Sequence, residues 1–402
     1  MLIRLATKSL LDRKTSVLLC CIAMAISIFV LLGVEHIRKE SKESFSSTIS
    51  GADLIVGTRS GQLNLLLYSI FRIGSPVNNI SWESYQNIAA NPTVNWTIPI
   101  SLGDSHKGFR VLGTTNAYFK HYKYGRKQAL SFAQGNEFSD TYNVVLGSAV
   151  ANSLNYKLGD PIVLSHGIGE TSFAVHEQYP FTISAILAPT GTPVDQTVHV
   201  KLEGIEAIHQ DSASDIDALQ PDSITAFIIG LKSRIATFRL QRQINEMPEE
   251  PLMAILPGVA LSELWQMMGA LEGTLLLISS MVFVAALLGL AAVMASSIRE
   301  RKNEIHLLRI LGAPPSFLFV LFQIEVVLIS LVSIFSGIAL LYLSLIVAQK
   351  EIAAQLGLHL GNNPLTINSL IIVVSIVIAV MLVASLPALQ AYKHAKSTIG
   401  PN

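Results

Sequence analysis

Four long apolar runs are spread unevenly along this chain, one near its start and three in its last third. The first run covers residues 17–34 and contains no charged residue. A run of this length is long enough to cross a bilayer once. The others cover 274–297, 317–347 and 367–389. Because half of all residues are hydrophobic and only 14% are charged, the chain is predicted to be a membrane protein with four transmembrane helices.

The long segment between the first and second runs has the pattern of a mixed α/β domain. Apolar stretches typical of strands, such as 94–100, alternate with helical stretches such as 81–90, which begins at the capping residue Ser81 and ends before Pro92. Residues 35–272 are therefore predicted to form one large extracytoplasmic domain with stalk helices. The predicted fold class is an α+β membrane protein in which this α/β domain follows the first transmembrane helix.

Two amphipathic segments with basic residues lie beside the spans. Residues 1–16 mix Lys and Arg with apolar residues, as expected of a helix at the membrane surface. Residues 298–315 place apolar side chains at helical spacing among charged ones, and Gly312 followed by Pro314 and Pro315 ends the helix. We predict a short coupling helix here that binds a soluble partner. The alternative is a basic loop that only fixes the orientation of the spans.

The distribution of Lys and Arg predicts the topology. Residues 1–16, 298–315 and the tail 390–402 together hold ten of them, whereas the loop 348–366 holds one. Cytoplasmic segments next to membrane spans are enriched in Lys and Arg. Both termini and the coupling helix are therefore predicted to be cytoplasmic in a multi-pass protein of the bacterial inner membrane, and the α/β domain to face outward.

The topology and several sequence segments of the chain resemble those of a known family. The topology, together with the sequence RERKNEIHLLRILGA at Arg299–Ala313, is similar to the MacB/FtsX-type permeases of ABC transporters and to the LolC and LolE lipoprotein-releasing permeases. GADLIVGTRSG at Gly51–Gly61 and the segment Leu146–Asp160 also resemble the outer domains of that family. We expect no nucleotide-binding domain fused to this chain, which would distinguish it from the MacB pattern.

This resemblance implies a permease subunit that works as a homodimer or heterodimer on a separate cytoplasmic ATPase. ATP would bind to that partner, and its hydrolysis would move the outer domain by mechanotransmission, with export or release of a substrate from the outer face. A periplasmic adaptor or substrate-binding protein is a further expected partner. The residues expected to dock on the ATPase are Arg299, Arg301, Lys302, Glu304, Ile305, His306 and Leu308.

Motifs for catalysis and nucleotide binding are absent from the sequence. There is no GxxxxGK[ST] phosphate loop, HExxH, CxxC or GxSxG motif, so we expect neither an enzyme nor a cofactor bound to this chain. Cys20 and Cys21 both lie inside the first apolar run and offer no disulfide framework. No basic patch of the kind that binds nucleic acid is evident.

Gln323 and Glu325 are polar residues inside the third apolar run. An ionisable residue within a membrane span is a candidate functional group, because an unpaired charge there is costly. The alternative is that Glu325 pairs within the helical bundle or is protonated. Both residues are retained as candidates that help to couple helix movements.

Histidines of the outer domain could make a metal site. His166, His176, His199 and His209 lie near acidic residues in the sequence, and a metal site there would favour the alternative function of a permease for metal uptake, for example of zinc. Uptake of a small solute belongs to the same alternative and would need a polar path through the bundle, which only Gln323 and Glu325 suggest. The spacing of the histidines matches no compact metal motif, and scattered surface histidines are the simpler interpretation. A receptor that relays an outer signal is a third alternative.

Overall fold

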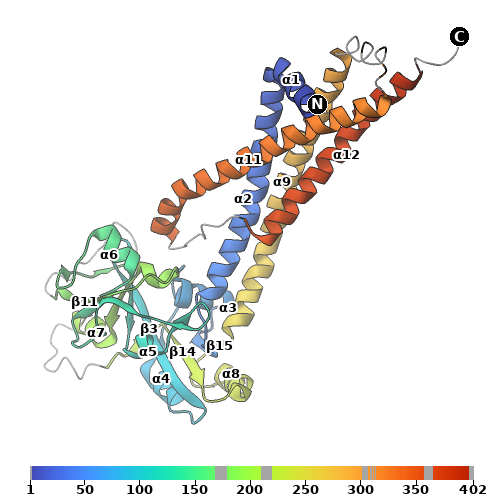
Figure 1. The fold of residues 1–402 in the computed structure, drawn as a ribbon. Coiled ribbons are helices and arrows are strands. Elements are labelled where there is room, and N and C mark those ends of the chain that lie inside the picture. The colour runs from blue at the N-terminus through green and yellow to red at the C-terminus, as the bar shows by residue number, and fades with distance from the viewer. Residues whose placement is uncertain are drawn as a thin grey trace. The chain divides into compact units, whose positions relative to one another are not determined.

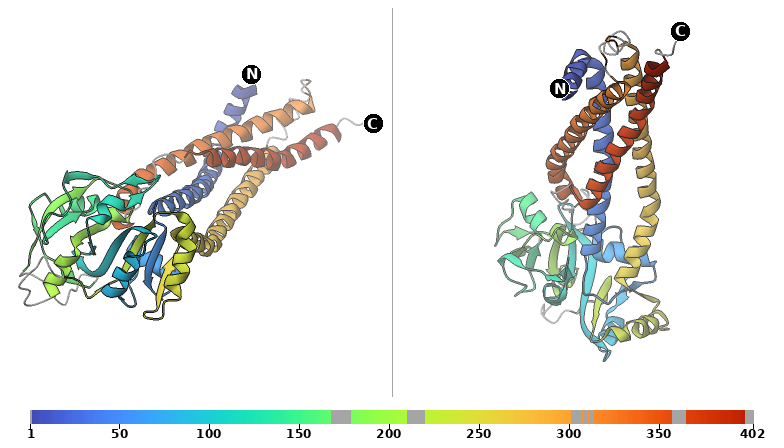
Figure 2. Two further views of the ribbon diagram at one scale, coloured as in Figure 1. Left: turned by 90° about the horizontal axis from the view of Figure 1, so that it is seen from below. Right: turned by 45° about the vertical axis from the view of Figure 1, so that its right-hand side comes forward.

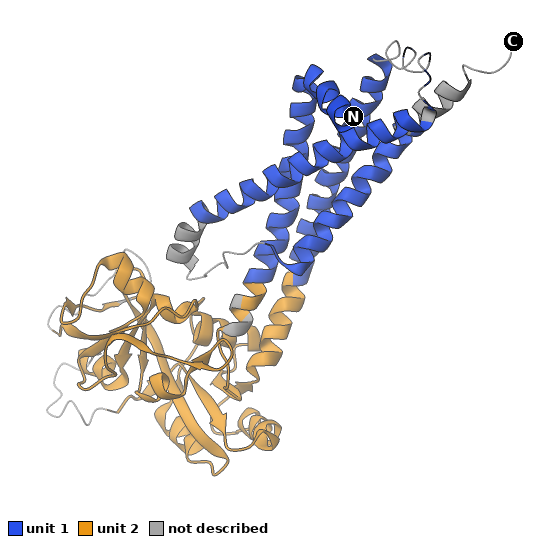
Figure 3. Cartoon of the chain, in the orientation of Figure 1, with its two compact units in different colours: residues 1–40, 269–349, 361–402 blue, residues 41–268, 350–360 orange. Residues whose placement is uncertain are grey.

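The computed structural model divides the chain into two compact units (Figure 3). One consists of residues 1–40, 269–349 and 361–402, and the other of residues 41–268 and 350–360. We call them the helical unit and the α/β domain. The structure describes residues 2–167, 179–209, 220–300, 314–356 and 365–397, together with residues 307, 310 and 312.

Among the residues that the structure describes, four helices are long and apolar enough to cross a membrane (Figure 1). Their candidate spans lie within Lys14–Glu43, Pro257–Glu300, Ser316–Val347 and Ile367–Pro387. The complete helices are α2 (Lys14–Ser47), α9 (Pro257–Glu300), α11 (Pro315–Leu356) and α12 (Ile367–Ser397), and the short α1 (Leu2–Asp12) precedes them. These four helices and the mixed α/β domain confirm the predicted fold class.

The helices extend beyond the apolar runs that predict them. The second stalk and the second span form one continuous helix of 44 residues, α9, because no proline interrupts the sequence after Pro257. Helix α11 continues to Leu356, into the segment expected as a loop, where alanine and other good helix formers follow the span. Helix α12 runs on to Ser397 and contains Pro387.

The helical unit has its own apolar core. Met24, Ile28 and Leu32 lie at intervals of four residues on one face of α2 and are buried, together with Leu290 of α9 and Val326 of α11. The close approach of α2 and α11 depends on Gly337, because a Cβ atom there would lie 2.9 Å from the carbonyl oxygen of Ala25. Small residues allow such close contacts between membrane helices.

The α/β domain is built on one large sheet. Its strand order is β15-β1-β14-β3-β4-β12-β8-β11-β7, with β10 on β3 and β9 on β11. The pairs β12/β4 and β11/β8 are parallel, and the other pairs in this sheet are antiparallel. Its strands are β1 (Leu54–Thr58), β3 (Val94–His106), β4 (Phe109–Thr114), β7 (Phe132–Gly135), β8 (Asn143–Leu146), β9 (Pro161–Ile162), β10 (Ser165–His166), β11 (Phe181–Leu187), β12 (Thr197–Lys201), β14 (Ala226–Leu231) and β15 (Leu252–Ile255).

Within the described residues, two small sheets and a set of short helices accompany the large sheet (Figures 1 and 2). The small sheets pair β2 (Ile80–Ser81) with β13 (Ser223–Ile224), and β5 (Lys123–Tyr124) with β6 (Gln128–Ala129). The helices are α3 (Gln62–Leu66), the π-helical turn η1 (Leu67–Phe71), α4 (Trp82–Ala89), α5 (Ala117–His121), α6 (Ser148–Leu154), η2 (Pro193–Gln196), α7 (Leu202–His209), η4 (Arg234–Ala236) and α8 (Thr237–Asn245). Ser81 caps α4 as expected, since its hydroxyl accepts a hydrogen bond from the Ser84 amide at 3.2 Å.

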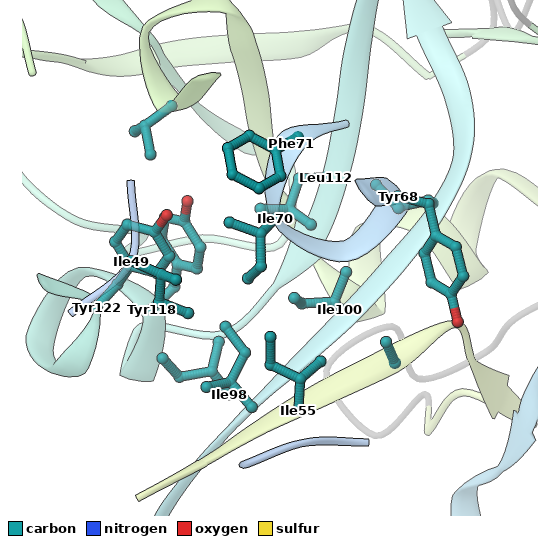
Figure 4. Close-up of a cluster of buried hydrophobic side chains, with 14 of the residues drawn as sticks. Ile49, Ile55, Tyr68, Ile70, Phe71, Ile98, Ile100, Leu112, Tyr118 and Tyr122 are labelled. Carbon is teal, nitrogen blue, oxygen red and sulfur yellow. The ribbon is translucent and has the colours of Figure 1, made fainter. Parts of the chain in front are cut away.

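The long strand β3 connects the two halves of the sheet. Its first half pairs with β14 and its second half with β4. The largest apolar cluster of the domain gathers around it, with Tyr118 and Tyr122 stacked at 4.8 Å between ring centroids and Ile98 and Ile100 beside them (Figure 4). Phe45 at the end of α2 joins this cluster.

Candidate functional site

A polar cluster lies at the end of the helical unit where α1, α2, α9 and α11 meet. Arg13, between α1 and α2, donates a hydrogen bond from Nη2 to the carbonyl oxygen of Ser297 at 3.0 Å. Its Nε lies 3.7 Å from Oε2 of Glu300, the last residue of α9. The final carbonyl groups of a helix lack partners within the helix and carry a partial negative charge. Arg13 therefore supplies a hydrogen bond to a carbonyl group at the end of α9, and it attaches the turn between α1 and α2 to this helix end.

A cavity of about 320 Å³ opens beside this ion pair. It is lined by apolar residues and by the polar side chains of Ser9, Arg13, Ser16, Ser296, Ser297, Glu300 and Glu325. The Glu325 residue is only 1% exposed and comes from α11. Its position facing the interior of the bundle, away from lipid, is the usual one for an ionisable residue in a membrane span. The cavity thus brings Glu325 together with Arg13 and Glu300.

The structure separates the two intramembrane candidates. Gln323 points toward α12, where its Nε2 donates a hydrogen bond to the carbonyl oxygen of Met381 at 3.4 Å. Glu325 instead lines the cavity beside α1 and α9. The two side chains therefore serve different helix contacts.

The predicted docking residues lie at and directly after the end of α9, the helix end that Arg13 contacts. Arg299 is exposed in the last turn of α9. Arg301, Lys302, Glu304, Ile305, His306 and Leu308 lie outside the described residues. The role of these residues in docking remains a prediction. The position of Arg299 shows only that the predicted docking segment begins in the last turn of α9.

A second polar cluster lies at the opposite end of the first span and was not predicted. The buried Glu35 carboxylate pairs with Arg38 at 2.8 Å and accepts a hydrogen bond from Asn368 of α12 at 3.5 Å. The sequence signal for this second cluster is Glu35, the charged residue that directly follows the first apolar run. The partner residues come from distant parts of the chain, which the run itself does not indicate.

The structure does not gather the four candidate histidines in its described parts. His199 is fully buried on β12, where its Nδ1 lies 3.2 Å from the carbonyl oxygen of Val145 and its ring packs against Tyr118. The side chains of His166 and His209 and the whole of His176 lie outside the described residues. Among the residues that are described, no group of three His, Cys, Asp or Glu could hold a metal ion. The metal site remains a prediction.

Burial of His199 makes the stability of the α/β domain sensitive to acid. Burial, followed by the nearby charge of Arg72, lowers the pKa of His199 from 6.5 to about 3. Between these values the unfolded chain binds a proton that the folded chain excludes, so stability falls as pH falls from 6.5 toward 3. We expect His199→Asn to reduce the slope of unfolding free energy against pH by about 1.4 kcal/mol per pH unit near pH 5.

Urea unfolding of the full chain in detergent, followed by tryptophan fluorescence, measures this slope, because Trp82, Trp96 and Trp265 all belong to the α/β domain. Burial also lowers the pKa of His106, so part of the slope should survive in the variant. Identical slopes for the variant and the parent chain would show that His199 does not carry the effect.

Comparison with known proteins identifies the family. Residues 16–247 match the family model of the MacB-like periplasmic core domain, and residues 276–399 match that of the FtsX-like permease C-terminal domain. The first match alone covers more than half of the chain, so this chain belongs to the MacB/FtsX-type permease family. It is an ABC transporter permease and a multi-pass membrane protein, of a family that implies an ABC ATPase partner and whose members are generally not enzymes.

Solved structures similar to the chain include the periplasmic region of MacB from Actinobacillus actinomycetemcomitans. It is 10% identical, with a TM-score of 0.36, over 54% of this chain and 94% of that chain. The extracellular domain of the noncanonic ABC-type transporter YknZ from Gram-positive bacteria is 11% identical, with a TM-score of 0.32, over 50% of this chain and 98% of that chain. No curated protein matches the chain.

Proposed function

We propose that this permease transmits the movement of a cytoplasmic ATPase to its α/β domain, which exports or releases a substrate at the outer face. The observation that carries the proposal is the continuity of α9, one helix of 44 residues that contains the second span and begins at Pro257 in the α/β domain. At a rise of 1.5 Å per residue, such a helix is about 66 Å long. A stiff helix transmits a displacement of one end to its other end.

Aromatic contacts hold together the ends of α2 and α9 that belong to the α/β domain. Phe45 of α2 packs edge-to-face on Trp265 of α9, with 5.9 Å between ring centroids. Phe45 also lies 4.7 Å from Phe71 of the π-helical turn. Such pairs resist relative sliding because they bury large rings in a fixed geometry. Movement of α2 or α9 would therefore be passed on to the core of the domain.

The opposite end of α9 is where we propose that the ATPase acts. The excess of Lys and Arg beside the spans supports a cytoplasmic position for α1 and for residues 298–315. The link from Arg13 to Ser297 and Glu300 would then make α1 and the base of the docking segment move together.

Exchange of the two charges tests this link. We expect Arg13→Glu and Glu300→Arg each to reduce stimulated ATP hydrolysis several-fold in the complex with the ATPase, and the double variant to recover part of it. Recovery should be partial because a carboxylate at position 13 could not donate a hydrogen bond to the Ser297 carbonyl. Thermal stability should change by about 1 kcal/mol or less, since Glu300 is largely exposed. Equal activity of all four chains would contradict a coupling role for the pair.

We further propose that two copies of the chain, or two related permeases, pair along α2 and α9. A groove of about 580 Å³ between these helices is lined by small and apolar residues that include Ala23, Ala285 and Gly289. A Cβ atom added at Gly289 would meet no atom within 4 Å, so this surface has room for a further helix. Small residues four positions apart favour the close approach of membrane helices.

The two glycines Gly289 and Gly337 form a matched pair for testing this arrangement. Gly337→Val should lower the thermal stability of the single chain, because its side chain would meet Ala25 and Ile28 of α2. Gly289→Val should leave the fold intact and weaken association about 10-fold, measured by single-molecule photobleaching in lipid bilayers over a range of protein densities. Unchanged association of the Gly289 variant would place the dimer contact elsewhere.

A further inference from the structure

Helix α8 covers one edge of the large sheet. Strand β15 is the last in the strand order and pairs with β1. Its Ala254 amide donates a hydrogen bond to Oδ1 of Asn245 at 2.6 Å, and its Ala254 carbonyl accepts one from Nε2 of Gln241 at 3.0 Å. An exposed strand edge invites pairing with another chain, and these side chains of α8 occupy it. Further strand addition at Ala254 is therefore blocked, and α8 is the outer surface at this edge.

Two large apolar side chains project from the start of this helix. Ile235 in the turn η4 is 92% exposed and Phe238 in α8 is 70% exposed. In the described part of the α/β domain, no other large hydrophobic residue is as exposed as either of them. The inner face of α8 is already used, because Leu240 and Ile244 are buried in the domain. Ile235 and Phe238 thus contribute little to the fold.

The segment that contains Ile235 and Phe238 is positively charged, whereas the domain as a whole is negatively charged. Residues 35–272 contain 17 Lys or Arg and 23 Asp or Glu, whereas residues 232–242 contain Lys232, Arg234, Arg239 and Arg242 and no acidic residue. Arg242 pairs with Glu246 at 2.9 Å. Within the described residues, no ion pair engages Arg234 or Arg239, and both are exposed. Two guanidinium groups therefore flank the exposed apolar pair.

A hollow continues this surface along α8. Gln241 and Asn245 follow Phe238 at spacings of three and seven residues, so all three lie on the same stripe of the helix. Gln241 and Asn245 line a cavity of about 210 Å³ together with Arg59 and Met253. The surface thus consists of an apolar ridge, two exposed cations and an adjacent polar hollow. We refer to Arg234, Ile235, Phe238 and Arg239 as the α8 patch.

We propose that the α8 patch is a docking surface for a second protein that presents an apolar pocket rimmed by carboxylates. Phe and Arg are both enriched in protein interfaces, which have an apolar core and a polar rim. Arginine also binds carboxylates through two parallel hydrogen bonds. A membrane surface fits less well, because helices that lie on membranes expose an apolar face over several turns and α8 exposes one turn.

This inference is independent of ATPase coupling and is tested without nucleotide. A photo-crosslinking amino acid is placed at position 238 in the full chain in its own cells, and at Val77 as the control, since Val77 is 68% exposed elsewhere in the same domain. The crosslinked protein is identified and purified, and its affinity for the full-length permease in nanodiscs is measured. We expect one discrete partner from position 238 that is not captured from position 77.

The affinity measurements decide whether the chemistry is as proposed. Phe238→Ser and the double variant Arg234→Glu with Arg239→Glu should each weaken binding of that partner at least 10-fold, and raised salt should weaken it in the parent chain. Val77→Ser should bind like the parent. Because the substituted side chains are exposed, thermal unfolding should be unchanged. Crosslinking only to lipid or to another copy of the permease, or unaltered affinity in both α8 variants, would overturn the proposal.

Discussion

A chain that carries Glu304→Arg and Leu308→Asp should insert into the membrane normally and yet fail to stimulate its ATPase. If residues 298–315 dock in a groove of the ATPase, Leu308 supplies apolar contact and Glu304 supplies a charge that fixes the register. Losing an interface anchor and reversing a paired charge typically weakens an interface by about 100-fold or more. Stimulated ATP hydrolysis in the reconstituted complex should therefore fall to the level of the ATPase alone.

A matched control separates docking from general damage. Glu246→Arg with Leu158→Asp makes the same kinds of change at exposed positions of the α/β domain and should leave stimulation unchanged. Membrane extraction and thermal unfolding of both double variants should equal those of the parent. Full stimulation by the Glu304 and Leu308 double variant would show that residues 298–315 do not dock on the ATPase.

A proline at position 268 should produce the opposite phenotype, in which ATP hydrolysis continues without movement of the α/β domain. Met268 lies within α9 before the second span and is 39% exposed, so its replacement removes little packing. Proline inside a helix removes a backbone hydrogen bond and clashes with the preceding turn, at a cost of about 3 kcal/mol. The kinked helix would then bend where the intact helix transmits displacement.

Limited proteolysis of the α/β domain, with and without a non-hydrolysable ATP analogue, measures this effect in the reconstituted complex. The parent chain and Met268→Ala should show a nucleotide-dependent cleavage rate. Met268→Pro should show one rate in both states, while its stimulated ATP hydrolysis stays within about two-fold of the parent, because the docking segment lies beyond the second span. A normal nucleotide response in the proline variant would mean that α9 does not carry the signal.

The sequence predicted which helices and strands are present better than it predicted where each of them begins and ends. Long apolar runs mark the four spanning helices, and the strand predicted at 94–100 lies within β3 (Val94–His106). The runs could not indicate that α9 continues from stalk to span, since helical spacing in the stalk and uniform apolarity in the span are different patterns. The helix and π-helical turn at Gln62–Phe71 were missed because their nearly continuous apolar residues suit a buried strand equally well.

The candidate site was predicted in part for a similar reason. Glu325 stands out in the sequence because a carboxylate interrupts an apolar run. Arg13 does not stand out, since it is one of several basic residues in 1–16 and its role depends on Ser297 and Glu300 at the far end of another helix. His199 was considered as a metal ligand from its neighbours in sequence, whereas β12 carries it into the core beside Tyr118. The sequence pattern did not indicate these contacts, because they join residues that are far apart in the chain.

The most direct test of mechanical coupling is the distance between the helical unit and the α/β domain in the presence and absence of nucleotide. Spin labels at Leu158 in the α/β domain and Leu288 in α9 occupy exposed positions, and Cys20 and Cys21, the free cysteines of the chain, are first replaced by alanine. Labelled chains are diluted with unlabelled ones and reconstituted with the ATPase. We predict that a non-hydrolysable ATP analogue shifts the distance distribution, and that Glu304→Arg with Leu308→Asp abolishes the shift. The same distribution with and without nucleotide in the parent complex would contradict the proposed function.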